Sequence, residues 1–217
     1  MPPAEKLHNR KEVGDGTRTV LLSAARAAFT EKGLEGARVD DIARRAGVNK
    51  QLVYHYFGSK DGLYTAVLEQ VYRQIREQES ALDLDSFPPE EAMRKLIEFS
   101  FDYLARSPDF VRILADENAH GGQHLQGSDI VKEVNRPIIE VIRKTLERGV
   151  ECGVFRRGLE PLHVYLSIAG MSFFYFANQH TLSRAFDTDL GTARGIAERR
   201  AHIVDFALNA LRPLKLA

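Results

Sequence analysis

The sequence is poor in cysteine, because Cys152 is the single thiol among 217 residues. One cysteine excludes an intrachain disulfide, and it excludes a zinc site built from several thiolates. Disulfides belong to oxidising compartments, so a chain without one is compatible with a reducing cytoplasm. We therefore expect a soluble cytoplasmic protein.

The sequence also lacks an excess of charge of either sign. It has 30 basic and 30 acidic residues, so its formal net charge is zero. A protein that holds nucleic acid by bulk charge carries a surplus of basic residues, so the zero net charge argues against this class. It also argues against a disordered chain of high net charge. Hydrophobic residues make up 44% of the chain, a usual share for a globular protein with a sizeable core.

Long apolar runs are missing as well. The longest run that is mostly apolar covers residues 164–177, and Ser167 and Ser172 interrupt it. A helix needs about 20 apolar residues to cross a bilayer, so this run predicts a deeply buried helix and no membrane partner. Residues 1–16 have no apolar stretch typical of a signal peptide, and their Pro and Gly residues predict a flexible tail.

The sequence does contain helical periodicity, whereas the alternating pattern of strands is scarce. Apolar residues recur three and four positions apart, and Gly and Pro separate the periodic segments. The pattern predicts an all-α fold of about nine helices. Their expected ranges are 17–32, 39–46, 50–56, a long helix capped by Ser59, 88–106, 108–120, 128–152 with a bend at Pro137, 161–180 and 192–212.

Two of these helices are short and close together in the sequence. Residues 39–46 and 50–56 are joined by Gly47-Val48-Asn49, and a tight turn with Gly between two helices is the sequence form of a helix-turn-helix. The second helix of such a motif lies in the DNA major groove. Segments this short are unstable alone, so they should pack with residues 17–32. The expected core consists of Phe29, Ile42, Val48, Val53 and Phe57.

This region resembles the DNA-binding domain of the tetracycline-repressor (TetR) family. The resemblance is specific over residues 17–70, and beyond them the chain shares only a run of helices and a closing Leu211-Arg212-Pro213. It implies a helix-turn-helix domain over 17–62 and a helical ligand-binding and dimerisation domain over 63–217. The pieces that carry it are Val39-Asp40-Asp41-Ile42-Ala43, Ala46-Gly47-Val48, Tyr54-His55-Tyr56-Phe57 and Ser59-Lys60.

The resemblance also implies roles for individual side chains. Lys50 and Gln51 match positions that reach bases, and their polar groups suit guanine and adenine. Tyr54, Tyr56 and Lys60 match positions that hold phosphates. The full set expected at the DNA is Arg38, Lys50, Gln51, Leu52, Tyr54, His55, Tyr56 and Lys60.

Several of these side chains have a second interpretation. Gln51 stands where the family often has a small residue, and Leu52 stands where it often has Thr or Ser. Because Leu52 cannot donate to a phosphate, it would touch a thymine methyl or join the core. Tyr54 and Tyr56 can alternatively pack inward, and Lys60 can be a solvated charge at the start of a helix.

The last two helices carry more apolar surface than one chain is expected to cover. Residues 161–180 are apolar nearly all round, and residues 192–212 carry two apolar stripes. A two-fold dimer with a four-helix bundle covers the second stripe, and the resemblance implies the same arrangement. The alternative is a larger monomeric core. The expected interface residues are Tyr165, Ala169, Phe173, Phe176, Ile203, Phe206, Ala207 and Ala210.

The C-terminal half is also expected to hold a small-molecule cavity, because such sites combine apolar walls with a few polar groups. Ordinary core packing is the alternative for each residue, and fewer than half should touch a ligand. The candidates are Phe99, Tyr103, Phe110, Ile113, Leu114, Glu117, Asn118, Ile138, Met171, Tyr175, Asn178 and Gln179.

A metal site is the rival interpretation of one segment. Glu117 and His120 have the i, i+3 spacing of di-iron bundle proteins, which need a second such pair. The other two matches lie in the expected tail and across Pro161, so we expect no metal, no cofactor and no catalytic residue. A helical metal-dependent enzyme using Glu117, His120 and His163 stays an alternative.

Together these observations predict a homodimeric transcriptional regulator, and in particular a repressor that a small-molecule effector releases from a palindromic operator. A helical interaction module that has lost DNA binding is the other alternative. Residues 1–62 contain eleven basic and eight acidic residues, so the neutral chain combines a mildly basic N-terminal part with a mildly acidic remainder. DNA binding should therefore depend on placed contacts and dimer geometry more than on bulk charge.

Overall fold

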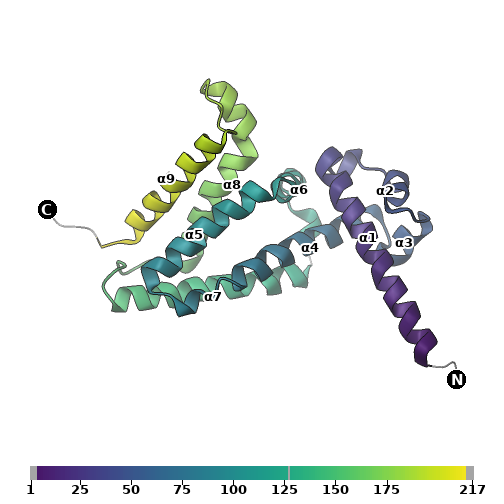
Figure 1. The fold of residues 1–217 in the computed structure, drawn as a ribbon, viewed down its shortest axis with the longest axis horizontal. Coiled ribbons are helices and arrows are strands. Elements are labelled where there is room, and N and C mark those ends of the chain that lie inside the picture. Colours follow the sequence, from purple (N-terminus) through teal and green to yellow (C-terminus); the bar gives the residue numbers. More distant parts are fainter. Residues whose placement is uncertain (1–3, 127, 214–217) are drawn as a thin grey trace. The chain divides into compact units, whose positions relative to one another are not determined.

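The computed structural model describes residues 4–126 and 128–213, with side chains from residue 16 onward. All secondary-structure elements within these ranges are helices, which confirms the all-α prediction (Figure 1). No helix of the described chain is long and apolar enough to cross a membrane. The elements are α1 (Ala4–Gly36), α2 (Val39–Ala46), α3 (Gln51–Phe57), α4 (Lys60–Ser80), η1 (Leu84–Ser86), α5 (Pro89–Arg106), α6 (Pro108–Ala119), η2 (Gln123–Leu125), α7 (Asp129–Glu151), α8 (Pro161–Ala185) and α9 (Ala193–Leu211).

The chain forms two compact units. Unit 1 consists of Met1–Val71 and Arg112–Ser128, and unit 2 consists of Tyr72–Val111 and Asp129–Ala217. The predicted division after residue 62 followed the helix-turn-helix alone. Unit 1 extends further because the first part of α4 and the end of α6 belong to it.

The first helix differs from its predicted start but not from its predicted end. α1 begins at Ala4, so residues 4–16 of the expected tail are helical, and residues 1–3 lie outside the described chain. Gly14 and Gly16 do not stop the helix, because a glycine costs only about 1 kcal/mol in a helix interior. Gly33 has φ 66° and ψ 178°, a conformation open to glycine, and it interrupts the helix where the sequence predicted.

In unit 1 the predicted core forms around α1, α2, α3 and the first part of α4. Phe29, Ile42 and Val53 are buried, while Val48 and Phe57 are half-buried. The guanidinium of Arg18 lies 5.4 Å from the centre of the Phe57 ring. The predicted apolar stripe of α4 is also confirmed, because Tyr64, Val67, Leu68, Val71 and Ile75 are all buried.

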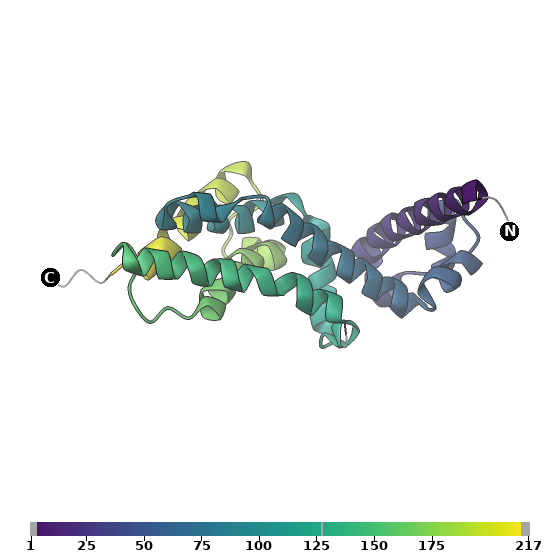
Figure 2. The same cartoon turned by 90° about the horizontal axis from the view of Figure 1, so that it is seen from below.

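In unit 2 the central element is α5, which packs against α7, α8 and α9 (Figures 1 and 2). Pro89 occupies its first turn, where a missing backbone N–H costs nothing. Met93, Leu96, Ile97 and Phe101 of α5 supply the middle of the core. α7 continues through Pro137 as one helix.

The apolar run in α8 is less buried than predicted. Leu166 and Phe174 are 53% and 57% exposed, whereas Ile168 and Tyr175 are buried in the core of unit 2. A single chain therefore does not cover α8 on every side, as expected of a helix with more apolar surface than one chain can cover. One side of α8 covers the core, and the other side is left uncovered by the described residues.

Candidate nucleic-acid interface and internal cavity

The turn between α2 and α3 is set by Gly47. Its φ of 68° is left-handed, and its N–H bonds to the last carbonyls of α2. The N–H of Val48 then reaches back 3.0 Å to the carbonyl of Ala43, which completes the helix end. The side chain of Asn49 accepts a hydrogen bond of 2.9 Å from the N–H of Gln51, so the predicted N-cap of α3 is confirmed.

The end of α3 is joined to α4 just as closely. The hydroxyl of Ser59 accepts a hydrogen bond of 2.9 Å from the N–H of Gly62, which confirms Ser59 as the cap of α4. A Cβ at Gly62 would lie 2.1 Å from the carbonyl oxygen of Phe57. Only glycine therefore allows the first turn of α4 to approach the last turn of α3 this closely.

These turns expose one face of α3. Lys50, Gln51 and His55 are exposed, and Tyr54 is 50% exposed, so Tyr54 does not pack inward. On the opposite face Val53 is fully buried. Such a face, polar and aromatic on a short helix held by a core, can approach base edges and phosphates.

The other residues expected at the DNA lie around this face. Arg38 is exposed just before α2, and Leu52 and Tyr56 are half-buried. The ring of Tyr56 meets that of His55 edge to face, with 5.0 Å between centroids. Leu52 is partly in the core and partly accessible, so its burial does not decide between core packing and contact with a thymine methyl.

Lys50 already has a partner in the free protein. Its ammonium lies 3.0 Å from a carboxylate oxygen of Asp40 in α2. This hydrogen bond and the charge of Asp40 raise the pKa of Lys50 above its ordinary value. Both side chains are largely exposed, so the pair is weak and solvent-screened. Asp40 therefore occupies the ammonium that the sequence predicts to reach a base.

Lys60 has a structural bond that the sequence did not reveal. Its ammonium donates a hydrogen bond of 2.9 Å to the carbonyl of Leu34, at the end of α1. An ammonium has three donors, so two remain for a phosphate. The alternative of a merely solvated charge does not hold for this side chain.

Unit 1 also contains a largely buried polar cluster, which we call the α6 cluster: Tyr64, Asp116, Glu117 and His124. The carboxylate of Asp116 accepts hydrogen bonds from Tyr64 Oη (2.9 Å) and the N–H of Leu34 (3.0 Å). The carboxylate of Glu117 accepts from His124 Nδ1 (2.7 Å) and from its backbone N–H (2.8 Å). Sequence reasoning missed the cluster because Tyr64 and Leu34, which bond to Asp116, are 52 and 82 positions away from it in the chain.

The bonds of the α6 cluster bear on the metal-site interpretation, because Glu117 and His120 have different partners. Glu117 bonds to His124, while His120 Nδ1 lies 2.8 Å from the carbonyl of Asp116. The i, i+3 pair of Glu117 and His120 therefore does not converge on one point. Among residues 4–126 and 128–213, no three or more His, Cys, Asp or Glu side chains are grouped to hold a metal ion.

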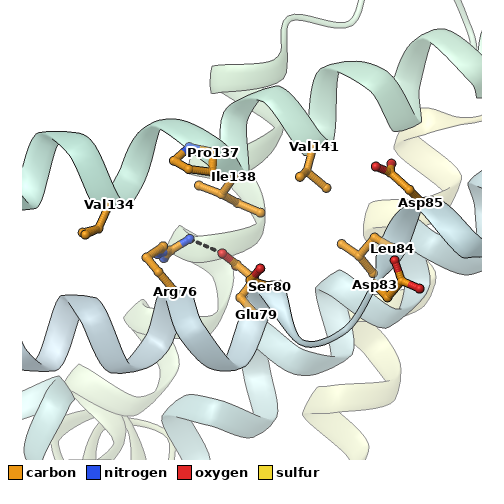
Figure 3. A pocket seen from close by; sticks show the side chains of 10 residues that line it. All are labelled: Arg76, Glu79, Ser80, Asp83, Leu84, Asp85, Val134, Pro137, Ile138 and Val141. Carbon is orange, nitrogen blue, oxygen red and sulfur yellow. Dashed lines mark hydrogen bonds and ion pairs between the residues drawn. The ribbon is translucent and has the colours of Figure 1, made fainter.

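In unit 2 a cavity of about 320 Å³ lies between α4, η1 and α7 (Figure 3). Arg76 and Glu79 of α4 point toward one another and form an ion pair, with Asp83 and Asp85 at the η1 end. The apolar part of the wall comes from one residue of η1 and four of α7. These are Leu84, Val134, Pro137, Ile138 and Val141.

The ion pair in this cavity is buried, with 10% of the Arg76 side chain and 6% of the Glu79 side chain exposed. Arg76 also donates a hydrogen bond of 3.1 Å to Tyr165 Oη, and its Nε has no partner among the described residues. Burial outweighs the attraction of Arg76 and raises the pKa of Glu79 to about 7. A buried charge pair beside an open, partly apolar space is a typical small-molecule site.

The predicted ligand residues do not gather in this cavity. Of the twelve candidates, only Ile138 lines it. Ile113, Leu114, Glu117 and Asn118 belong to unit 1. The aromatic candidates of unit 2 pack on one another instead, with ring centroids of Phe99 and Tyr103 5.8 Å apart and those of Tyr103 and Phe110 5.4 Å apart.

Three further candidates close the loop between α8 and α9 or bond within α8. Tyr175 Oη and Gln179 Nε2 both donate to the carbonyl of Leu190, at 2.5 and 3.0 Å. Asn178 Nδ2 donates to the carbonyl of Phe174 at 2.9 Å. Met171 lines a second hollow, of about 440 Å³, between α8 and α9. Local spacing could not foresee the two bonds to Leu190, because they depend on where the loop folds back.

The predicted dimer residues divide into two groups. Ile203 and Ala207 are buried in the core of unit 2, Phe176 packs 4.9 Å from Phe101, and Tyr165 bonds to Arg76. These four are committed to their own chain, at least in part. Ala169 and Phe173 are half-buried. Exposed apolar positions on α8 and α9 include Leu162, Leu166, Phe174, Phe206 and Ala210.

Comparison with protein families finds two matches along the chain. Residues 21–67 match the model described as bacterial regulatory proteins, tetR family. Residues 89–207 match the model described as tetracyclin repressor-like, C-terminal domain. The two matches cover the helix-turn-helix and most of unit 2.

Individual relatives agree with these matches. The chain is 38% identical over 203 residues to the HTH-type transcriptional repressor NicS of Pseudomonas putida, covering 94% of this chain and 96% of that protein. It is 31% identical over 166 residues to the repressor KstR2 of Rhodococcus jostii, covering 73% and 76%.

Solved structures share the fold at lower identity. A transcriptional regulator of Streptomyces coelicolor superposes with a TM-score of 0.66 at 24% identity, covering 91% of this chain and 99% of that one. The regulator FadR of Bacillus subtilis, solved with stearoyl-CoA, superposes with a TM-score of 0.65 at 16% identity, covering 89% and 99%.

The Lys50–Asp40 pair generates the first prediction. Asp40→Asn frees the ammonium of Lys50 and removes a negative charge beside the expected DNA face. Because an exposed pair is worth up to about 1 kcal/mol, the affinity for a DNA duplex at fixed salt should rise by up to about fivefold. Fluorescence anisotropy measures it. The control is Asp129→Asn, which removes the acid of an exposed Asp–Lys pair in unit 2. Equal effects of the two substitutions would contradict the role given to Asp40.

The second prediction concerns pH. The folded chain keeps the proton of Glu79 up to about pH 7, whereas the unfolded chain loses it near pH 4.5. Between these values only the unfolded state is stabilised by losing the proton, so the free energy of unfolding falls as pH rises. Relative to the wild type, Glu79→Gln should therefore gain in Tm from about pH 5 to about pH 8.

Glu90→Gln is the matched control. A hydrogen bond from Arg212 lowers the pKa of Glu90, so its contribution to stability is present above 4.5 and is lost as pH falls through its lower folded value. The deficit of this variant should stay constant over the same range and shrink only in acid. If the difference in Tm between the wild type and Glu79→Gln did not change with pH, Glu79 would not be held neutral by burial.

Proposed function

The chain belongs to the TetR family of bacterial transcriptional regulators, and on this premise we propose that it represses transcription as a homodimer on a palindromic operator until an effector enters unit 2. The single observation that carries the proposal is the exposed face of α3, held rigidly by Gly47 and Asn49. A regulator that binds chromosomal DNA acts in the bacterial cytoplasm. NicS and KstR2 are repressors, which favours repression over activation here.

The division of labour within α3 follows from exposure and chemistry. Lys50 and Gln51 stand at its start, where a recognition helix meets base edges. Lysine can donate to guanine acceptors, and glutamine can pair with adenine through two hydrogen bonds. Tyr54 and Lys60 carry the donors for phosphates, with Arg38 in reserve at the start of α2. The basic surplus of the first 62 residues is only three charges, so these placed contacts must supply most of the affinity.

The symmetry of the operator follows from that of the protein. Two identical α3 helices related by a two-fold axis read the same sequence on opposite strands, so the operator is a palindrome. The exposed apolar side chains of α8 and α9 are the surface we assign to the second copy. A bundle of these helices with their partners would cover Leu166, Phe174 and Phe206.

The effector is assigned to the cavity at Arg76. It offers an apolar wall from α7 and a buried charge pair, which suits a molecule with a compact apolar body and a polar group. FadR, which shares the fold, was solved with stearoyl-CoA, so this fold can hold small organic molecules. If the effector weakens DNA binding, DNA weakens effector binding by the same factor.

The DNA proposal is tested by titrating a labelled fragment from upstream of the gene, against an equal length of random duplex. Wild type should prefer a palindrome in that fragment. Lys50→Ala should weaken the specific complex by about 1–3 kcal/mol, whereas Tyr54→Phe removes only a phosphate hydrogen bond and should weaken specific and random DNA alike. Absence of any salt-sensitive DNA affinity would favour an interaction module instead.

The effector proposal is tested by filling the cavity. Metabolites that raise the Tm of the wild type and release its DNA are first found in a thermal-shift screen. Val141→Trp should then abolish both responses while leaving effector-free DNA affinity unchanged. Val150→Trp adds the same bulk to α7 at a half-buried site that does not line the cavity, and it should keep both responses. Equal behaviour of the two variants would place the effector elsewhere.

A further inference from the structure

Leu34 is held from both sides of its backbone. It follows Gly33, whose left-handed φ ends the regular part of α1, so its polar groups fall at a helix end. Its N–H donates to Asp116 Oδ2 at 3.0 Å, and its carbonyl accepts from the ammonium of Lys60 at 2.9 Å. The side chain of Leu34 is buried, so both bonds lie at the edge of the unit 1 core.

Asp116 is itself fixed by its surroundings. The same Oδ2 that binds Leu34 accepts a hydrogen bond of 2.9 Å from Tyr64 Oη. Burial and the bond to Asp116 raise the pKa of Tyr64 well above its ordinary value, so the hydroxyl stays a donor. On the other side, a Cβ at Gly33 would lie 2.8 Å from Asp116 Oδ1. The carboxylate therefore fits closely against a backbone that has no side chain at residue 33.

Lys60 is half-buried at the first position of α4, directly after the Ser59 cap. A lysine side chain is flexible, and fixing it in one conformation costs rotamer entropy. The bond to Leu34 meets part of this cost before any DNA is bound. An ammonium anchored through one donor presents its other donors in a defined direction.

We propose that Asp116 is a positioning residue for a phosphate contact of Lys60, acting through the backbone of Leu34. Asp116 holds the N–H of Leu34, and the carbonyl of Leu34 then holds the ammonium of Lys60 where a DNA phosphate can take its free donors. Asp116 touches no DNA itself. The inference rests on the proposed DNA-binding function, and it makes DNA affinity depend on where the end of α6 lies.

The proposal runs against simple electrostatics, which makes it testable. Removing an acid from a DNA-binding unit ordinarily strengthens binding, because one repulsion of the phosphates is lost. If Asp116 instead positions Lys60, its removal should cost a phosphate contact. Each phosphate contact contributes about 0.9 to the slope of log affinity against log salt.

The experiment measures the affinity of the full-length protein for a random-sequence 30-base-pair duplex, by fluorescence anisotropy at a series of KCl concentrations. Wild type, Asp116→Ala, Lys60→Gln and the double variant form a cycle. Asp116→Ala and Lys60→Gln should each make the negative slope of log affinity against log salt shallower by about 1 for every bound protomer. The double variant should match Lys60→Gln, because the two residues serve one contact.

Two matched variants separate positioning from stability. Tyr64→Phe removes the other hydrogen bond to Asp116 but leaves the bond to Leu34, so its slope should equal that of the wild type. Asp116→Asn removes the charge but keeps a carbonyl acceptor, and it should restore the slope. Should Asp116→Ala prove unfolded by circular dichroism, Asp116→Ser replaces it, since its hydroxyl ends one bond short of the carboxylate oxygen. Its slope should fall as well.

The failures are distinguishable. A wild type without salt-dependent DNA affinity defeats the proposed function as a whole. A wild type that binds, with an unchanged slope for Asp116→Ala, overturns the inference alone. So do losses for Asp116→Ala and Lys60→Gln that add fully in the double variant, or a slope lost in Tyr64→Phe.

Discussion

The left-handed turn at Gly47 is the constraint on which the DNA-facing surface depends. With φ 68° at this residue, α2 ends through bonds to its own last carbonyls and the chain turns at once into α3. Asn49 then fixes the first turn of α3 by bonding the N–H of Gln51. Since α3 is only seven residues long, it would not persist without this turn and the buried Val53. Which side chains face outward is thus decided by backbone geometry before any contact with DNA.

Each of the two units contains a group of polar side chains that lies partly or fully in its interior. In unit 1 the α6 cluster ties the end of α6 to α1 and α4 through directional bonds. In unit 2 the Arg76–Glu79 pair sits beside an open cavity, where burial keeps Glu79 protonated up to about pH 7. A buried pair of this kind contributes little net stability.

The sequence predicted well whatever is decided within a few residues. The bounds of α2, the caps at Asn49 and Ser59, the break at Gly33 and the stripe from Tyr64 to Ile75 all depend on local pattern. It failed where distant segments meet. Asp116 and Leu34 bond across 82 positions, and no periodicity reveals such a bond. The ligand candidates were chosen by type, and only Ile138 lines the cavity at Arg76, because a cavity forms only where packed helices leave space; for the other candidates, contact with a ligand stays a prediction.

The assignment of α3 as a recognition helix is tested most directly by hydroxyl-radical footprinting of the protein on DNA from upstream of its gene. Two copies of α3 related by a two-fold axis should protect symmetric patches on the backbone. Their centres should be one helical turn, roughly 34 Å, or a multiple of it apart, and Lys50→Ala should need about 5- to 150-fold more protein to give the same protection. A single unsymmetric patch, or symmetric patches that Lys50→Ala gives at the same protein concentration as the wild type, would contradict the account.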